Sequence, residues 1–167
     1  MDNLTIAALV VDVIPILSQF GTSTVDKIKQ NLASSGTNAT GKTSNSIKFS
    51  VKDEGLRQML TITGRPFFMT VETGRKATPD YKPSQQFVET IRQWMQAKGV
   101  PGSAYAIAQA IHKKGTKLHQ TGGRSDIVSS VVNEGLVQEI AKSVLAKFSS
   151  DVLKNSVKLF NSGTVIN

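Results

Sequence analysis

A change of hydrophobic period near residue 47 constrains the fold of this chain more than any other feature. Before residue 34, apolar residues recur at helical spacing, whereas Ile47, Phe49 and Val51 alternate strictly with polar residues. Strict alternation is the pattern of a half-buried strand, because successive side chains point to opposite faces of a sheet. The segment 41–76 is therefore expected to contain strands, with helical segments on both sides of it.

Two antiparallel strands are expected within this segment. The letters DEG at 53–55 predict a turn, and a second alternation follows through Leu56, Leu60 and Ile62. A short connection between two alternating runs is typical of a β-hairpin. The next letters, PFFMTVETG, are compatible with a third short strand or with a helical turn.

Helical patterns surround this hairpin and complete an α+β layout. They are predicted before residues 34–36 (one long helix, or two joined near Pro15), between Pro83 and Gly99, between Ser103 and Gly115, and from Glu134 to about Phe160. The polar letters of 34–46 predict a loop, and IVSSVV at 127–132 is compatible with a brief strand. The apolar N-terminal letters are compatible with the core or with an arm that docks on a neighbouring subunit. We expect one domain over residues 1–167, a small antiparallel sheet packed by a long N-terminal and a long C-terminal helix.

The composition limits the classes of function. The net charge of +8, from 20 basic and 12 acidic residues, favours either contact with phosphates or a protein that is basic for other reasons, such as acidic partner subunits. The chain has no cysteine, so disulfides, cysteine metal ligands and a cysteine nucleophile are excluded. No apolar run approaches the roughly 20 residues that span a bilayer, and no signal-peptide pattern begins the sequence, so no membrane contact is expected.

The letters GTNATGKT at 36–43 satisfy the phosphate-loop motif G-x-x-x-x-G-K-[ST] in full. That motif works when a buried strand enters the loop and a helix leaves it, because loop amides and the helix N-terminus then hold the phosphates. Here a polar helical pattern precedes the loop and a strand pattern follows it. We therefore expect a polar loop without nucleotide, and no cofactor.

Residues of the kinds that enzymes use occur without the partners that catalysis needs. Glu72 has no evident second carboxylate, so we expect a structural or subunit-contacting role, with Arg65, Arg75 or a neighbouring subunit's arginine as ion-pair partner. His112 and His119 lie among cations rather than carboxylates, which favours a solvated basic face over a metal site. No enzyme activity and no bound metal are expected.

The letters from IRQWMQ to HKKGT have the outline of a helix-turn-helix. The second helix begins with small and apolar residues, SAYAIAQA, where a DNA reader would place polar and basic ones. Basic residues gather instead at its end and in the following loop. Non-specific phosphate contact is the alternative function, by a small nucleic-acid-binding module over 84–124 with these candidate DNA-facing residues: Lys113, Lys114, Lys117 and Arg124.

Three pieces of the chain together resemble the tail-completion (head-to-tail joining) proteins of tailed bacteriophages. That family opens its first strand with Thr-Gly-x-Leu-x-x-Ser-Ile after a helix, and an aromatic segment after the second strand ends in Glu-x-Gly-Thr. This chain has TGKTSNSI at 40–47 and FFMTVETG at 67–74, followed by a C-terminal helical pattern. It departs from the family at Thr43, where Leu is usual, and at the turn, which has Glu-Thr-Gly-Arg.

The resemblance implies a virion structural protein without enzyme chemistry. It implies a homo-oligomeric ring at the neck or tail, assembled in the host bacterial cytoplasm beside portal, neck or tail proteins and around the DNA path. Gly41–Thr43 would then enter the first strand. Residues 79–125 have no counterpart in compact members of the family and are expected to form an inserted helical hairpin with a basic loop. Subunit contacts are expected at the glutamate turn: Glu72, Gly74, Arg75 and Lys76.

Overall fold

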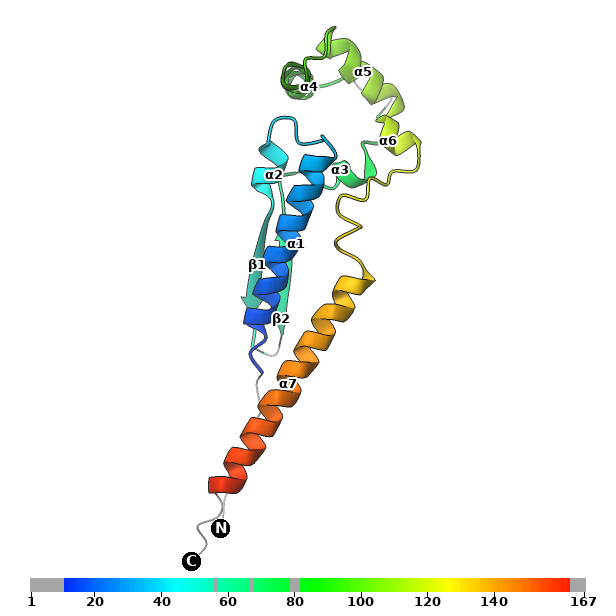
Figure 1. Ribbon diagram of the computed structural model, residues 1–167. Helices are drawn as coiled ribbons and strands as arrows, with labels where there is room; N and C mark the ends of the chain where they lie inside the picture. Colours follow the sequence, from blue (N-terminus) through cyan, green and yellow to red (C-terminus); the bar gives the residue numbers. More distant parts are fainter. Residues whose placement is uncertain (1–10, 56, 67, 79–81, 163–167) are drawn as a thin grey trace, which may run out of the picture.

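The computed structural model describes residues 11–55, 57–66, 68–78 and 82–162. Its elements, in chain order, are α1 (Ile14–Ser34), α2 (Lys42–Ser46), β1 (Lys48–Asp53), β2 (Gln58–Thr63), α3 (Thr70–Thr73), α4 (Gln85–Lys98), α5 (Ala104–Lys114), α6 (Lys117–Gln120) and α7 (Glu134–Ser162). The molecule is elongated, with α4 and α5 at one end and the last turns of α7 at the other (Figure 1). The predicted α+β class, with one small antiparallel sheet and a long helix towards each terminus, is confirmed.

Helix α1 forms one continuous element from Ile14 onwards. Pro15 lies in its first turn, where the missing N–H removes no intrahelical hydrogen bond. The backbone N–H of Val13 donates to Gln58 Oε1 at 2.9 Å, which ties the start of the helix to β2. The predicted apolar stripe is buried: Leu17, Gly21, Thr24, Val25, Ile28 and Leu32. The apolar letters before residue 11 lie outside the described residues.

Strands β1 and β2 form the antiparallel hairpin that the alternation predicts. The register pairs Phe49 with Ile62 and Val51 with Leu60, so these apolar side chains share one face of the sheet. Helix α1 packs on the hairpin, and Gly21 lies against Phe49 and Leu60. Among the described residues each strand has one neighbour, so both outer edges of the sheet carry unpaired backbone groups.

The main core lies where α1, the start of β1 and the segment before α7 meet. Its buried members are Val25, Ile28, Leu32, Ile47, Ile127 and Val128. Two of these residues, Ile127 and Val128, belong to the IVSSVV segment. In the structure this segment is a turn and not the strand that its β-branched letters suggest. Backbone N–H groups of Val131 and Val132 donate to the carbonyl of Val128, at 3.0 and 2.8 Å, in place of ladder bonds. Burial of two apolar side chains from one tight turn explains why β propensity did not decide its structure.

Short helices replace three of the predicted loop or strand segments. The last five residues of the polar loop 34–46 form α2, so Gly41–Thr43 begin a helical turn and not a strand. The segment PFFMTVETG contains α3, the helical turn that was one of its two predicted forms. The predicted basic loop contains α6, because the Thr116 side chain accepts a hydrogen bond from the His119 N–H and caps its first turn.

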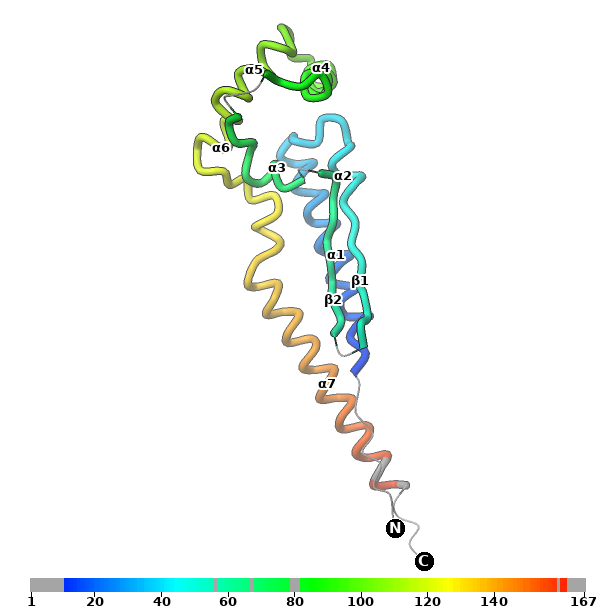
Figure 2. Tube along the Cα trace, turned by 180° about the vertical axis from the view of Figure 1, so that it is seen from behind, coloured from blue at the N-terminus to red at the C-terminus, as the bar shows by residue number. Residues whose placement is uncertain are grey.

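Helices α4 and α5 form the predicted helical hairpin. Ser84 and Ser103 cap their N-termini through side-chain oxygens, as expected for Ser103, and Gly99 ends α4 in the left-handed conformation. A second small core joins the two helices through Ile91, Met95 and Ala108. The hairpin lies beyond the end of the sheet in both views (Figures 1 and 2).

Gly21 offers a test of the packing between α1 and the sheet. A Cβ at this position would lie 2.5 Å from Phe49 Cδ2 and 2.9 Å from Leu60 Cδ1. Alanine is better than glycine in a helix by about 1 kcal/mol, but overpacking a core costs about 1–3 kcal/mol. We expect Gly21→Ala to lower the free energy of unfolding by about 1 kcal/mol in urea denaturation. The control is Ser23→Ala on the exposed side of α1, and a Gly21→Ala protein more stable than wild type would contradict this packing.

Candidate functional site

Glu72 places a buried carboxylate between α3 and the turn that precedes α7. Its side chain is 6% exposed. Oε1 accepts a hydrogen bond from Ser129 Oγ at 2.6 Å, and Oε2 accepts from the Val128 backbone N–H at 2.8 Å and from Ser125 Oγ at 3.2 Å. The Glu72 carbonyl also accepts from the Ser125 N–H at 3.1 Å. One side chain therefore fixes the conformation of residues 125–129.

The carboxylate of Glu72 is stabilised by neutral donors. Burial opposes its ionisation, but the hydrogen bonds from residues 125–129, that from Ser129 first, hold the pKa of Glu72 below its usual value. The described part of the chain places neither Arg65 nor Arg75 within ion-pair distance of it. The predicted ion pair with either arginine is wrong, because the turn already supplies the hydrogen bonds that the carboxylate needs.

Residues 73–78, which we call the strap, run along the end of α5 and the start of α6. The Arg75 N–H donates to Thr116 Oγ1 and the Thr116 N–H donates back to the Arg75 carbonyl, both at 2.9 Å. The Thr78 N–H donates to the carbonyl of His112 at 2.7 Å. These bonds attach the helical hairpin to the rest of the chain at a second point beside Glu72.

Two glycines allow the strap to lie this close. Gly74 has φ +71°, and a Cβ there would lie 2.5 Å from both the His119 backbone nitrogen and Thr116 Oγ1. A Cβ on Gly115, which has φ +76°, would lie 2.7 Å from the Arg75 carbonyl oxygen. Positive φ and close approach of another backbone both favour glycine. The Thr-Gly-Arg letters after Glu72 thus serve a contact inside this chain.

His112 is buried beneath the strap. The solvated basic face that the sequence suggested for it is therefore wrong. The Nδ1 of His112 lies 2.7 Å from Thr78 Oγ1, and its Nε2 lies 3.3 Å from Arg75 Nη2. Because a guanidinium group only donates, Nε2 accepts and Nδ1 carries the proton. The Arg75 guanidinium also stacks 3.8 Å from the centroid of the Phe87 ring. His112 therefore joins α5 to the strap and to α4.

The predicted subunit contacts separate into two pairs in the structure. Glu72 and Gly74 are buried against their own chain, so their roles are internal. Arg75 is half-buried in the cluster with His112, and Lys76 is exposed. The signal for the internal roles was absent from the local sequence, because the partners of the Glu72 side chain lie 53 to 57 residues further along.

The charge of the protein is concentrated in residues 82–125, which we call the basic lobe. This segment has seven Lys and Arg residues and one acidic residue, a net charge of +6, whereas the rest has thirteen against eleven, a net charge of +2. The single acid, Glu89, pairs with Arg92 on α4. The lobe is also the end of the elongated molecule that carries α4, α5 and α6 (Figure 2). The charge of +8 is therefore a local property of one end.

The four candidate DNA-facing residues differ in their surroundings. Lys113 and Lys114 end α5 and Lys117 begins α6; all three are exposed and form no ion pair with the described residues. Arg124 Nε instead contacts Asp126 Oδ1 at 2.6 Å, and this pair lowers the pKa of Asp126. The three lysines thus remain available to an anion, while the charge of Arg124 is compensated within the chain.

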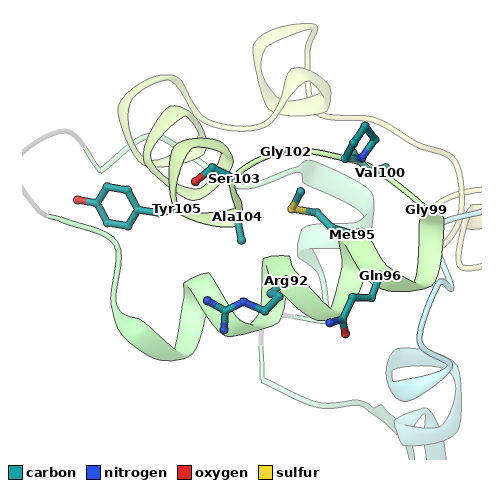
Figure 3. A pocket seen from close by; sticks show the side chains of 10 residues that line it. Arg92, Met95, Gln96, Gly99, Val100, Gly102, Ser103, Ala104 and Tyr105 are labelled. Carbon is teal, nitrogen blue, oxygen red and sulfur yellow. The ribbon is translucent and has the colours of Figure 1, made fainter.

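An open groove follows the connection between α4 and α5. Arg92, Met95 and Gln96 of α4 and Tyr105 at the start of α5 are among the residues that line it (Figure 3). The sulfur of Met95 points towards the Val100–Ala104 connection, where Met95 contributes to the second core. The groove combines a core side chain with a surface arginine and a tyrosine, and it brings together no acid, base and nucleophile.

The phosphate-loop letters do not form a phosphate loop. Helix α1 precedes them and the five-residue α2 follows, so no strand enters the loop. The Nζ of Lys42 donates to Gln93 Oε1 at 2.7 Å and does not face the loop amides of a nucleotide site. Within the described ranges, no group of three or more His, Asp or Glu side chains is placed to hold a metal ion, and no helix has the length and apolarity to cross a membrane.

Replacing Glu72 tests its structural role. We expect Glu72→Gln to lower the free energy of unfolding at pH 7 by about 1–3 kcal/mol, because one amide cannot accept all the donors of the turn. Since the folded pKa is lowered, the contribution of Glu72 is complete well above the unfolded value of about 4.3 and is lost as the pH falls through the folded pKa.

The measurement is urea denaturation of both proteins at pH 7 and at pH 3. The difference between wild type and Glu72→Gln is expected to shrink at pH 3. Glu54→Gln, at an exposed turn residue, provides the control and should be near wild type at both pH values. A difference that grows at acid pH would show that Glu72 is protonated in the folded protein.

Comparison of the chain with protein-family models, curated proteins and solved structures finds no match. Its function is therefore inferred from the geometry above and from the short motifs at 40–47 and 67–74. The first motif contains α2 and ends just before β1, and the second contains α3 with Glu72.

Proposed function

We propose that this chain is a virion structural protein that forms a homo-oligomeric ring at the head-to-tail neck or in the tail of a tailed bacteriophage. In this role it joins neighbouring portal, neck or tail proteins and surrounds the DNA path, after assembly in the bacterial cytoplasm. The position in the virion rests on the resemblance of residues 40–47 and 67–74. The ability to assemble rests on the surface of the molecule.

The observation that carries the proposal is the apolar surface of α7. Ten large hydrophobic side chains are exposed in the described residues, and six of them lie on this one helix. The helix runs past the end of the sheet in both views, so the described strands and the described part of α1 do not cover its last turns (Figures 1 and 2). Apolar surface gathered on one projecting element is typical of a protein that binds other subunits.

Two further features support a mechanical role without enzyme activity. The buried carboxylate and the buried imidazole, Glu72 and His112, both use their polar atoms to attach segments of their own chain. The two sheet edges, which no other described strand covers, offer backbone donors and acceptors to a neighbouring subunit. The buried polar groups of Glu72 and His112 thus stabilise the fold, while the edges of the sheet and the apolar side chains of α7 can contact other subunits.

The assembly of the purified protein tests this proposal. We expect native mass spectrometry and light scattering to detect one discrete oligomer of many copies, and electron microscopy to show closed rings. Antibodies against the chain should label the neck or tail of purified virions. A protein that stays monomeric at high micromolar concentration, or that is missing from virions, would contradict the proposal.

A small nucleic-acid-binding module is the second candidate, and the basic lobe favours it. The lobe has a net charge of +6 and three exposed lysines without acidic partners in the described chain. Such lysines release counterions from phosphates, which gives affinity without sequence preference. The two candidates share this surface, because a ring around DNA also benefits from positive charge near the DNA path.

The salt dependence of DNA binding tests the lysines. We expect the triple variant Lys113→Gln, Lys114→Gln and Lys117→Gln to reduce the slope of log affinity against log salt by about 2–3, since each phosphate contact contributes about 0.9. Fluorescence anisotropy with a short duplex measures this slope.

The matched control removes the same charge from the body of the molecule. Lys27, Lys48 and Lys52 are exposed on α1 and β1, and their replacement by Gln should leave most of the slope unchanged. Equal losses in the two triple variants would show that net charge, and not the basic lobe, governs binding.

A further inference from the structure

We infer that α7 joins successive copies of this chain through two different apolar patches. One patch lies on the first half of α7 and the other on its second half, and the first patch of one copy packs against the second patch of the next copy. The inference rests on the proposed ring and names the surface that would build it. It assigns to α7 a contact of the head-to-tail type, in which each copy uses one patch towards each of its two neighbours.

The two patches are formed by the most exposed apolar side chains of α7. The N-terminal patch consists of Val137, Leu145 and Phe148, which are 62%, 63% and 47% exposed. The C-terminal patch consists of Leu153, Val157 and Phe160, which are 66%, 57% and 79% exposed. Single exposed hydrophobic side chains are common on protein surfaces, whereas several gathered on one element mark an interaction surface.

The patches point in different directions around the helix. Successive residues of an α-helix are rotated by about 100°, so the centres of the two patches lie roughly 130° apart. The half-buried residues of the first turns, Leu136, Ile140 and Val144, occupy a third direction, and α7 contacts α1. One straight partner helix cannot cover two patches on different faces, so two partners are needed.

This geometry favours a heterologous contact. A two-fold dimer would bury the same patch of both copies, whereas a ring buries two different patches at each interface. One interface would cover one patch of each kind, on the order of 500 Å² of apolar surface for six such side chains. The lower limit for a specific interface is about 1,000 Å² in total with just over half apolar, so the six side chains supply close to the apolar area of the smallest specific interfaces.

Charge on α7 also selects unlike patches. Lys147 and Asp151 form an ion pair with each other. Of the remaining charges, the first half of the helix has Glu134 and Glu139 against Lys142, and the second half has Lys154 and Lys158. An acidic half therefore meets a basic half when unlike patches pack, whereas like patches would bring like charges together.

A second copy is the occupant that best matches these patches. The other exposed large hydrophobics of the described residues are dispersed, on the chain before α3, on α4, on α5 and before α7: Met69, Trp94, Tyr105 and Val132. None of these positions is flanked by a further exposed large hydrophobic residue at helical spacing. Among the described residues, the complementary apolar surface for one patch of α7 is therefore the other patch of another α7.

Two variants of opposite kind test the inference. The first replaces the N-terminal patch by Leu145→Gln and Phe148→Gln, and the second replaces the C-terminal patch by Leu153→Gln and Val157→Gln. Both change exposed positions to a residue that favours helices, and circular dichroism verifies that α7 is intact. Each variant alone is expected to be monomeric in native mass spectrometry, with a loss of the wild-type oligomer.

The decisive step mixes the two variants, one of them labelled with ¹⁵N. Each retains the patch that the other lacks, so the mixture is expected to form a 1:1 heterodimer and nothing larger. Met69→Gln with Trp94→Gln provides the control for removing apolar surface elsewhere and should keep the full oligomer.

The outcomes separate this inference from the proposed function. A wild-type oligomer that persists in either α7 variant, or a mixture that stays monomeric, would overturn the inference and leave the ring in place. A wild-type protein that is itself monomeric would overturn both.

Discussion

The hydrogen bonds to the Glu72 carboxylate hold the parts of this molecule in their arrangement. They join the α3 turn, which follows the sheet, to residues 125–129, which run from the last residue of the basic lobe towards α7. The same turn buries Ile127 and Val128 in the main core. The turn that leads into α7 is therefore held by one ionised, buried side chain with the donors around it, and also by Asn31 of α1, which donates to the carbonyl of Ile127 and to Ser130 Oγ.

The molecule divides its surface chemistry along its length. Positive charge is gathered in the basic lobe and apolar surface is gathered on α7, whose first part runs beside α1 and whose last turns lie at the end of the molecule opposite the lobe (Figure 1). The strap, with Gly74, Arg75 and His112, attaches the lobe at its base. Such a division suits a ring subunit that contacts its neighbours with one end and faces a polyanion with the other.

Sequence patterns correctly predicted the elements whose formation depends on neighbouring residues in the chain. Alternation at Phe49 and Val51 identified the hairpin, and Ser103 with Gly99 bounded the helices of the lobe. Long-range contacts decided the rest. The β-branched letters at 127–132 form a turn because Glu72 and the core hold them there, and His112 is buried because the strap crosses it. Likewise, the periodicity of α7 predicted a helix but could not show that much of its apolar surface stays exposed.

Disulfide crosslinking tests the central claim, head-to-tail assembly through α7, most directly. The chain has no cysteine of its own, so one cysteine can be introduced in each patch. A protein with both Phe148→Cys and Val157→Cys is expected to give, on oxidation, a ladder of covalent multimers that ends at the ring, while either change alone leaves monomers. Efficient dimers from a single cysteine variant, or no ladder from the double variant, would contradict the account.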